Sequence, residues 1–180
     1  MSGETARRVL VTGGAKGVGG AIVRTLVAQG FDVDFTYRAS AEAAEALATE
    51  LEQAHPGRSV RALTLDLADR TALDAFCAAV EETVYFGLVH NAGQSYDALA
   101  AMMAQDKAEA AMQVNFWSLT QIAKSLMRTM LRARAGRIVV IGSVAALQGN
   151  PGNAAYAASK GALLSYIRTL AAATAATQAA

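Results

Sequence analysis

Short runs of β-branched and aromatic residues alternate along this chain with longer alanine-rich stretches, and this alternation constrains the fold more than any other feature. The short runs, each typical of a strand, are Arg8–Thr12, Asp32–Tyr37, Val60–Leu65, Tyr85–His90 and Arg137–Gly142. The stretches with helical spacing are Gly19–Gln29, Ala41–Ala54, Arg70–Thr83, Gln105–Ala133 and Asn153–Ala175. Strands and helices at this pitch predict βαβ units. We therefore expect an α/β fold: a Rossmann-like, doubly wound parallel sheet in three αβα layers, with five recognisable strands.

Composition narrows the class of protein further. The 180 residues are 53% apolar and 17% charged, which suits a single domain, 1–180, with a sizeable core. The net charge is +1 and no block of lysines or arginines occurs, so we expect no nucleic-acid partner and no anionic-membrane partner. One cysteine excludes an intrachain disulfide and suits a reducing compartment. With two scattered histidines, the sequence offers no metal site.

The N-terminal residues lack the apolar core and cleavage site of a signal peptide. Nor does any apolar run reach the roughly 20 residues that a membrane helix requires. We therefore expect a soluble, cytoplasmic protein.

A glycine-rich turn, TGGAKGVG over residues 12–19, joins the first strand to the first helix. In this position backbone N–H groups can approach a pyrophosphate, and the helix dipole favours its negative charge. Gly13 suits the tight turn, Gly17 removes a side chain beside the phosphates, and Gly19 allows close helix packing. The context of a strand before the turn and a helix after it favours dinucleotide binding over a merely structural turn. The residues expected to contact the cofactor here are Thr12, Gly13, Lys16, Gly17, Val18 and Gly19.

The end of the second strand indicates which dinucleotide is bound. Sites that prefer NAD have an acidic residue at this point, which binds the ribose hydroxyls. Here the strand ends in Tyr37 and Arg38, without an acid. Arg38 can hold a 2′-phosphate, and Lys16 can assist it, so the expected cofactor is NADP(H). The alternative is that Arg38 is an ordinary solvated arginine.

Two further strand ends are expected to line the cofactor site. Asp66 follows the third strand, where its carboxylate can accept from the adenine amine while Leu67 packs nearby. A helix cap or a solvent-facing aspartate is the alternative. Asn91, Ala92 and Gly93 close the fourth strand and form a small, backbone-rich corner suited to the cofactor ribose. Taken alone, this tripeptide is only a turn signal.

Three residues near the end of the chain form a candidate catalytic group. Ser143 lies at the tip of the fifth strand, and Tyr156 and Lys160 occur four residues apart, on one face of a helix. A neighbouring ammonium favours the phenolate and lowers the pKa of the phenol, so such a tyrosine can donate a proton to a carbonyl oxygen. The serine hydroxyl can hold that oxygen. A Tyr-x-x-x-Lys pair alone is more often an amphipathic surface pair, and its value here comes from Ser143 and the glycine turn.

Together these motifs resemble the short-chain dehydrogenase/reductase family in order and spacing: TGGAKGVG, Asp66, NAG, the asparagine in QVNFWSL, Ser143 and YAASK. The resemblance implies a Ser–Tyr–Lys triad in which Tyr156 and Lys160 also contact the cofactor. It implies that Asn115 is a fourth catalytic member, which bends its helix and holds a water that relays protons to Lys160. From the residues alone, Asn115 is only a polar residue in a helix.

Within the family the sequence is similar to 3-oxoacyl-(acyl-carrier-protein) reductases. This implies NADPH-dependent reduction of a 3-oxoacyl thioester to the 3-hydroxyacyl form, as in fatty acid biosynthesis, with Tyr156 as general acid. Reductases of polyketides, sugars or steroids share the motifs, and a non-catalytic dinucleotide-binding or oligomerising protein is the other alternative. The resemblance also implies a homodimer or homotetramer formed through the long helices that contain Asn115 and Tyr156.

The family usually continues past the catalytic helix, with two more strands, a proline-glycine turn near the carboxamide of the cofactor and a substrate-covering segment. None of these is found in the sequence, which ends in the low-complexity stretch AAATAATQAA. We expect either a fragment of an active reductase or a protein that is itself truncated. The final stretch is expected to extend the last helix or to fray.

Overall fold

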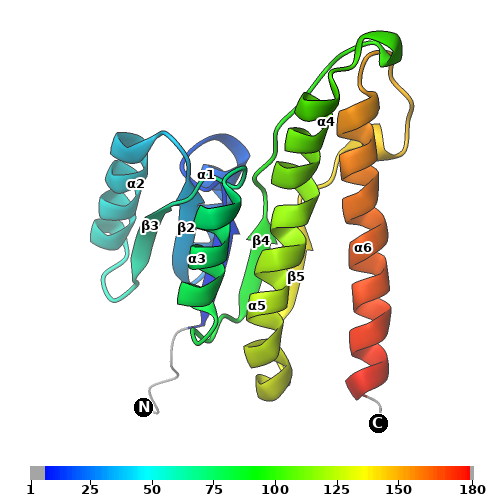
Figure 1. Ribbon diagram of the computed structural model, residues 1–180. Helices are drawn as coiled ribbons and strands as arrows, with labels where there is room; N and C mark the ends of the chain where they lie inside the picture. Colours follow the sequence, from blue (N-terminus) through cyan, green and yellow to red (C-terminus); the bar gives the residue numbers. More distant parts are fainter. Residues whose placement is uncertain (1–6, 179–180) are drawn as a thin grey trace.

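The computed structural model describes residues 7–178 and contains one sheet of five parallel strands (Figure 1). The strands are β1 (Arg8–Thr12), β2 (Asp32–Tyr37), β3 (Val60–Thr64), β4 (Gly87–His90) and β5 (Arg137–Val140). Their order in the sheet is β3-β2-β1-β4-β5, so the chain starts in the middle, moves to one edge and then crosses to the other. This is the expected doubly wound topology, and the fold prediction is confirmed.

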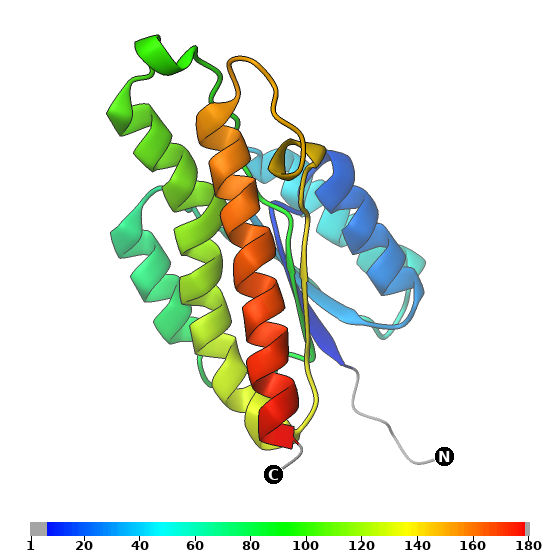
Figure 2. The same ribbon diagram turned by 90° about the vertical axis from the view of Figure 1, so that its right-hand side faces the viewer.

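Helices cover both faces of this sheet. The α-helices are α1 (Gly17–Ala28), α2 (Ala41–Ala54), α3 (Arg70–Val80), α4 (Gln105–Met112), α5 (Ser118–Ala133) and α6 (Ala154–Gln178), with short 3₁₀ turns η1 (Ala100–Met102) and η3 (Val144–Ala146). Helices α1 and α2 lie on one side of the sheet, and α3, α5 and α6 lie on the other (Figure 2). Because all strands are parallel, their carboxyl ends meet at one edge, where ligands of such folds bind.

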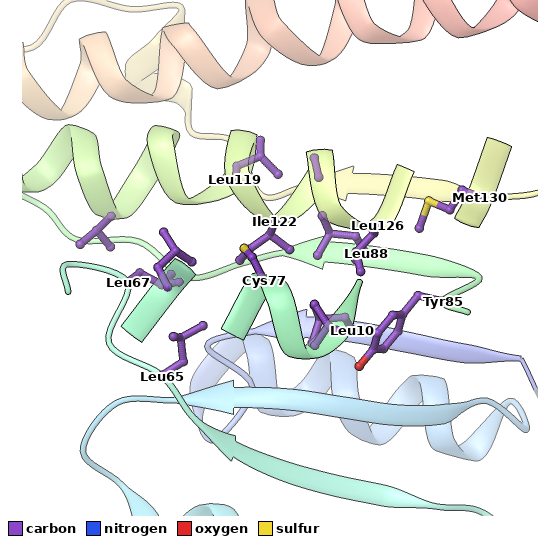
Figure 3. Close-up of a cluster of buried hydrophobic side chains, with 14 of the residues drawn as sticks. Leu10, Leu65, Leu67, Cys77, Tyr85, Leu88, Leu119, Ile122, Leu126 and Met130 are labelled. Atoms are coloured by element: carbon purple, nitrogen blue, oxygen red, sulfur yellow. The ribbon is translucent and has the colours of Figure 1, made fainter. Parts of the chain in front are cut away.

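Two hydrophobic clusters hold the three layers together. Successive strand residues point to opposite faces, so Val11 packs toward α1 and α2 while Leu10 packs toward α3 and α5. In the cluster between the sheet and helices α3 and α5, Leu10 and Leu88 pack with Leu119 and Leu126 of α5. All four side chains are fully buried (Figure 3). Each such side chain contributes about 1.5–3 kcal/mol through burial. The sheet is therefore a rigid base for the loops at its carboxyl edge.

The helical stretch between β4 and β5 is interrupted. Spacing predicts one helix over Gln105–Ala133, but residues Gln113–Trp117 (η2) form a π-helical turn between α4 and α5. The prediction of an unbroken helix is therefore wrong over these five residues. A π-turn accommodates one extra residue in the helix, and such turns are frequent at functional sites. Its central residue is Asn115, which is fully buried.

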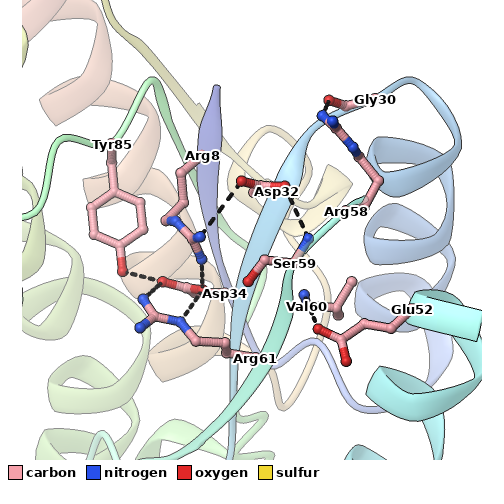
Figure 4. Close-up of polar contacts among 10 residues, drawn as sticks. All are labelled: Arg8, Gly30, Asp32, Asp34, Glu52, Arg58, Ser59, Val60, Arg61 and Tyr85. Atoms are coloured by element: carbon pink, nitrogen blue, oxygen red, sulfur yellow. Dashed lines mark hydrogen bonds and ion pairs between the residues drawn. The ribbon is translucent and has the colours of Figure 1, made fainter. Parts of the chain in front are cut away.

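A buried ionic network ties β1, β2 and β3 together near their amino ends (Figure 4). Asp34 is fully buried and accepts hydrogen bonds from Arg8 at 2.5 Å, from Arg61 Nε at 2.8 Å and from the Tyr85 hydroxyl at 2.6 Å. Burial acts to raise the pKa of Asp34, but the hydrogen bonds from Arg61 and Tyr85 and the charges of both arginines outweigh it and hold the pKa below its usual range. This carboxylate therefore stays ionised inside the protein.

The last helix continues through the alanine-rich stretch as far as Gln178, and Ala179 and Ala180 lie outside the described residues. Within residues 7–178, none of the helices combines the length and the apolar character needed to span a bilayer.

Candidate active site

The turn between β1 and α1 depends on glycine at specific positions. Gly13 has φ +68° and Gly17 has φ +57°, a region that side chains rarely adopt. A Cβ on Gly19 would lie 2.0 Å from the Gly13 carbonyl oxygen, so any larger residue would force the turn open. The side chain of Asn91, at the end of β4, donates to the carbonyls of Thr12 at 3.2 Å and Gly13 at 2.9 Å. The neighbouring strand thus fixes the shape of the turn.

A cleft of about 480 Å³ opens beside this turn at the carboxyl edge of the sheet. It runs from the glycine turn past the ends of β2 and β3 to the loop after β4. The predicted cofactor residues that line it are Gly13, Lys16, Arg38, Asp66, Leu67, Asn91, Ala92 and Gly93. The remaining predicted contacts, Thr12, Gly17, Val18, Gly19, Tyr156 and Lys160, lie outside its lining. The cleft is therefore lined by predicted cofactor residues from the glycine turn and from the ends of β2, β3 and β4.

The phosphate end of the site fits a pyrophosphate. Nothing lies within 4 Å of the position that a Cβ on Gly17 would occupy, so the backbone there is open to a ligand. Lys16 precedes α1 without capping it through a side-chain hydrogen bond. The first N–H groups of a helix in this state are well placed to bind an anion. A dinucleotide phosphate is a suitable occupant of this open turn.

The ends of β2 and β3 supply the polar groups of the cleft. Arg38 and Lys16 are both exposed and both line it, which gives the cleft two positive charges at the place expected for a 2′-phosphate. Asp66 is half-buried, and one of its carboxylate oxygens accepts from the Ala68 N–H at 2.9 Å. It does not cap α3, because Asp69 does so through the N–H groups of Thr71 and Ala72. The other carboxylate oxygen of Asp66 remains for a ligand.

The catalytic candidates lie beyond the other end of the cleft, in the loop after β5 and on α6. Ser143 follows β5, and its hydroxyl accepts from the Ala145 N–H at 3.2 Å, which leaves its own proton free to donate. Tyr156 and Lys160 lie one turn apart on α6, with the Lys160 Nζ 5.8 Å from the centroid of the Tyr156 ring. Lys160 is only 4% exposed and donates to the Ile141 carbonyl at 2.8 Å. Burial lowers the pKa of its ammonium.

Asn115 connects this helix to the loop after β4. Its Oδ1 accepts from the Gln94 N–H at 2.7 Å, and its Nδ2 donates to the Gln94 carbonyl at 2.9 Å and to the Ser159 hydroxyl at 2.8 Å. Ser159 in turn donates to the Tyr156 carbonyl at 2.7 Å. A Cβ on Gly93 would lie 3.4 Å from both Asn115 Oδ1 and Lys160 Nζ, so a small residue there lets the loop approach closely.

Three residues of this arrangement are not apparent from the sequence. Gln94 and Ser159 are the partners of Asn115, and the buried ring of His90 lies between Thr12 and Asn115. The sequence does not indicate the partners of His90, which are 78 and 25 residues away along the chain. Its place directly before the NAG tripeptide is the one signal that could have pointed to it. Among residues 7–178, no three His, Cys, Asp or Glu side chains are grouped so that they could hold a metal ion.

Comparison with known proteins agrees with this geometry. A family model described as short chain dehydrogenase matches residues 7–179. Nodulation protein G of Rhizobium meliloti is 36% identical over 170 residues, which are 93% of this chain and 66% of that protein. The 3-oxoacyl-(acyl-carrier-protein) reductase FabG of Salmonella typhimurium is 35% identical over 166 residues, which are 90% of this chain and 65% of that protein. The chain spans about two thirds of the length of these curated relatives.

Solved structures with the same fold include a variant of actinorhodin polyketide ketoreductase with NADPH. It superposes with a TM-score of 0.85 at 29% identity, over 94% of this chain and 66% of that one. A short chain dehydrogenase/reductase family protein gives a TM-score of 0.85 at 30% identity, over 94% of this chain and 69% of that one. On the family model, the relatives and the fold, this chain belongs to the short-chain dehydrogenase family.

Proposed function

We propose that this chain is an NADPH-dependent carbonyl reductase that converts a 3-oxoacyl thioester, carried by an acyl carrier protein, to the 3-hydroxyacyl form. The observation that carries the proposal is Lys160, a buried ammonium anchored to the Ile141 carbonyl beside the ring of Tyr156. Burying a charge costs free energy unless the charge is paired and hydrogen-bonded, so a buried ammonium at this place indicates a function. Support for the substrate class comes from two relatives named 3-oxoacyl-(acyl-carrier-protein) reductase. The protein of Salmonella typhimurium is 35% identical to this chain, and that of Synechocystis is 33% identical.

The reaction assigns one task to each side chain. NADPH, when bound in this site, would supply the hydride that the carbonyl carbon requires. Tyr156 donates its phenolic proton to the carbonyl oxygen, so that no full negative charge accumulates there. Ser143 donates a hydrogen bond to the same oxygen. Its hydroxyl proton is available because the hydroxyl only accepts in its bond with the Ala145 N–H. The ammonium of Lys160 favours the phenolate that forms on Tyr156, and Asn115 fixes the first turns of α6 through Ser159.

The preference for NADPH rests on Arg38 and Lys16. Both line the cleft, and Arg38 occupies the place after β2 where an acidic residue would favour NAD. A guanidinium recognises a phosphate through charge-assisted hydrogen bonds. We further propose a cytoplasmic homodimer or homotetramer formed through α5 and α6, which lie side by side on one face of the sheet (Figures 1 and 2).

The purified chain is expected to oxidise NADPH when an acetoacetyl thioester is added, because Ser143, Tyr156 and Lys160 supply the acid and the polarising groups. The measurement is the loss of the NADPH absorbance, with NADH and substrate-free reactions as controls. Should NADPH raise the melting temperature while neither a thioester nor a simple ketone is reduced, the chain binds the dinucleotide without acting as a reductase.

Replacing Arg38 by alanine is expected to raise KM for NADPH about tenfold and to leave KM for NADH unchanged. A hydrogen bond to a charged group contributes about 1.5–3 kcal/mol. Since about 1.4 kcal/mol corresponds to a tenfold change in a binding constant, the low end of this range gives the expected effect. Arg132→Ala, in the last turn of α5, removes the same charge far from the cleft and serves as the control. Equal increases in KM for both cofactors would show that Arg38 does not read the 2′-phosphate.

A further inference from the structure

A buried histidine joins the two halves of the site. His90 is the last residue of β4 and is only 1% exposed. Its Nδ1 lies 3.1 Å from the Thr12 hydroxyl, where β1 enters the glycine turn. Its Nε2 lies 3.2 Å from the carbonyl oxygen of Asn115, at the centre of the π-turn. One ring thus contacts the Thr12 side chain at the entrance of the glycine turn and the backbone of the π-turn that contains Asn115.

The neighbours of this ring select a single protonation state. The Thr12 hydroxyl accepts from the N–H groups of Asn91 and Ala92, both at 3.1 Å. Since a hydroxyl has one proton, and both its lone pairs are used, that proton must point to Nδ1 of His90. Nδ1 is then an acceptor, and Nε2 carries the ring proton and donates it to the Asn115 carbonyl. The neutral form persists at physiological pH, because burial lowers the pKa of His90 to about 4.

The carbonyl that His90 binds belongs to the residue that positions α6. Asn115 reaches Ser159 with its Nδ2, and Ser159 contacts the backbone of Tyr156. A shift of the π-turn would therefore move Asn115 and, through Ser159, the turn of α6 that carries Tyr156 and Lys160. Reacting groups are sensitive to such shifts, since a misplacement of about 1 Å can cost about 100-fold in rate.

We propose that His90 is a positioning residue for the reaction: it accepts from Thr12 and donates to the Asn115 carbonyl, and so holds the π-turn in register with the glycine turn. Bound cofactor and the proton-donating Tyr156 are thereby kept at a fixed separation. The consequence for the rate rests on the proposed reductase function, whereas the hydrogen-bonded link itself does not.

Two amide replacements of His90 and one apolar replacement distinguish the effect of its bond with Thr12 from that of its bond with the Asn115 carbonyl. The His90→Gln carboxamide can donate from near the position of Nε2, and the shorter His90→Asn carboxamide lies near the position of Nδ1. His90→Phe keeps a ring but makes neither bond. We expect His90→Phe and His90→Asn to lower kcat about 10-fold to 100-fold with KM for NADPH within about twofold, and His90→Gln to recover most of kcat.

This kinetic pattern separates positioning from folding. If His90 had a merely structural role, the loss of kcat in each variant would follow the fall in its melting temperature. KM for NADPH would then rise as kcat falls. That outcome would overturn the proposal, as would wild-type kcat in His90→Phe or equal recovery by His90→Asn and His90→Gln.

Nitrogen-15 NMR of the full chain gives a readout that does not depend on turnover. The chain has two histidines, so a His55→Gln variant identifies the His90 signals. We expect an unprotonated Nδ1 and a protonated Nε2 near pH 7. Amide hydrogen exchange over residues 156–160 should be faster in His90→Phe and restored in His90→Gln. A proton on Nδ1, or exchange that does not respond to these variants, overturns the proposal. If these results hold but the wild-type chain reduces no carbonyl, the proposed function fails and the link stands.

Discussion

Replacing Tyr156 by phenylalanine is expected to lower kcat for carbonyl reduction by about 100-fold to 10,000-fold, the range in which general acid catalysis contributes. The substitution removes one oxygen and keeps the ring beside Lys160. Without the phenolic proton, the oxygen of the carbonyl would acquire negative charge with only Ser143 to stabilise it. Steady-state rates with NADPH and an acetoacetyl thioester measure the effect. The dissociation constant for NADPH, measured by cofactor fluorescence, is expected to change by less than about threefold.

Tyr166→Phe is the matched control, because Tyr166 lies on the same helix and its ring packs edge-on against Phe116. It also loses a phenolic hydroxyl but lies more than two turns further along α6. We expect it to retain wild-type kcat. A Tyr156→Phe enzyme with undiminished kcat, or two tyrosine variants with equal losses, would contradict the assignment of Tyr156 as the acid.

The sequence predicts the sheet well because each strand carries its own signal. The sequence predicts β1 and β2 with the bounds that the structure has, since each is a short run rich in β-branched and aromatic residues. The fourth strand begins at Gly87 rather than Tyr85, because Tyr85 turns its hydroxyl to Asp34 before pairing with β1 starts. Local pattern therefore identifies the elements, while tertiary contacts set their ends.

The site is less accessible to sequence reasoning, because its residues act through partners far along the chain. Spacing predicts a regular helix around Asn115, whereas the structure has a π-turn over Gln113–Trp117. The role of Asn115 is expected only by resemblance, and the structure adds Ser159 and Gln94 as its partners. Arg38 was selected for its place after a strand, and its assignment to a 2′-phosphate stays a prediction.

Replacing Asp34 by alanine is expected to lower the free energy of unfolding by about 3 kcal/mol. Removing one partner of a buried ion pair costs about 3–5 kcal/mol. The lower end applies because the Arg61 side chain is 52% exposed and can regain water. The Tyr85 hydroxyl cannot regain water, because Tyr85 is only 1% exposed. Without Asp34 this hydroxyl therefore has no acceptor for its hydrogen bond. Urea unfolding followed by circular dichroism, at one protein concentration and without cofactor, gives the change.

Asp34→Asn tests the charge itself, since it keeps the shape of the side chain. The folded pKa of Asp34 lies below its usual range, so ionisation stabilises the fold fully above the unfolded pKa of about 3.9. This stabilisation is lost as the pH falls through the folded value. The difference in unfolding free energy between wild type and Asp34→Asn should therefore be constant from about pH 8 to about pH 5 and narrow below about pH 4.

An exposed ion pair provides the comparison for both variants. Glu50 pairs with Arg24 on the surface between α1 and α2, where solvent screens the interaction. Glu50→Ala is therefore expected to leave the urea midpoint nearly unchanged. If Asp34→Ala destabilised the protein no more than Glu50→Ala does, the network of Arg8, Asp34 and Arg61 would be incidental to stability. The three strands would then be held in register by their backbone hydrogen bonds and apolar faces alone.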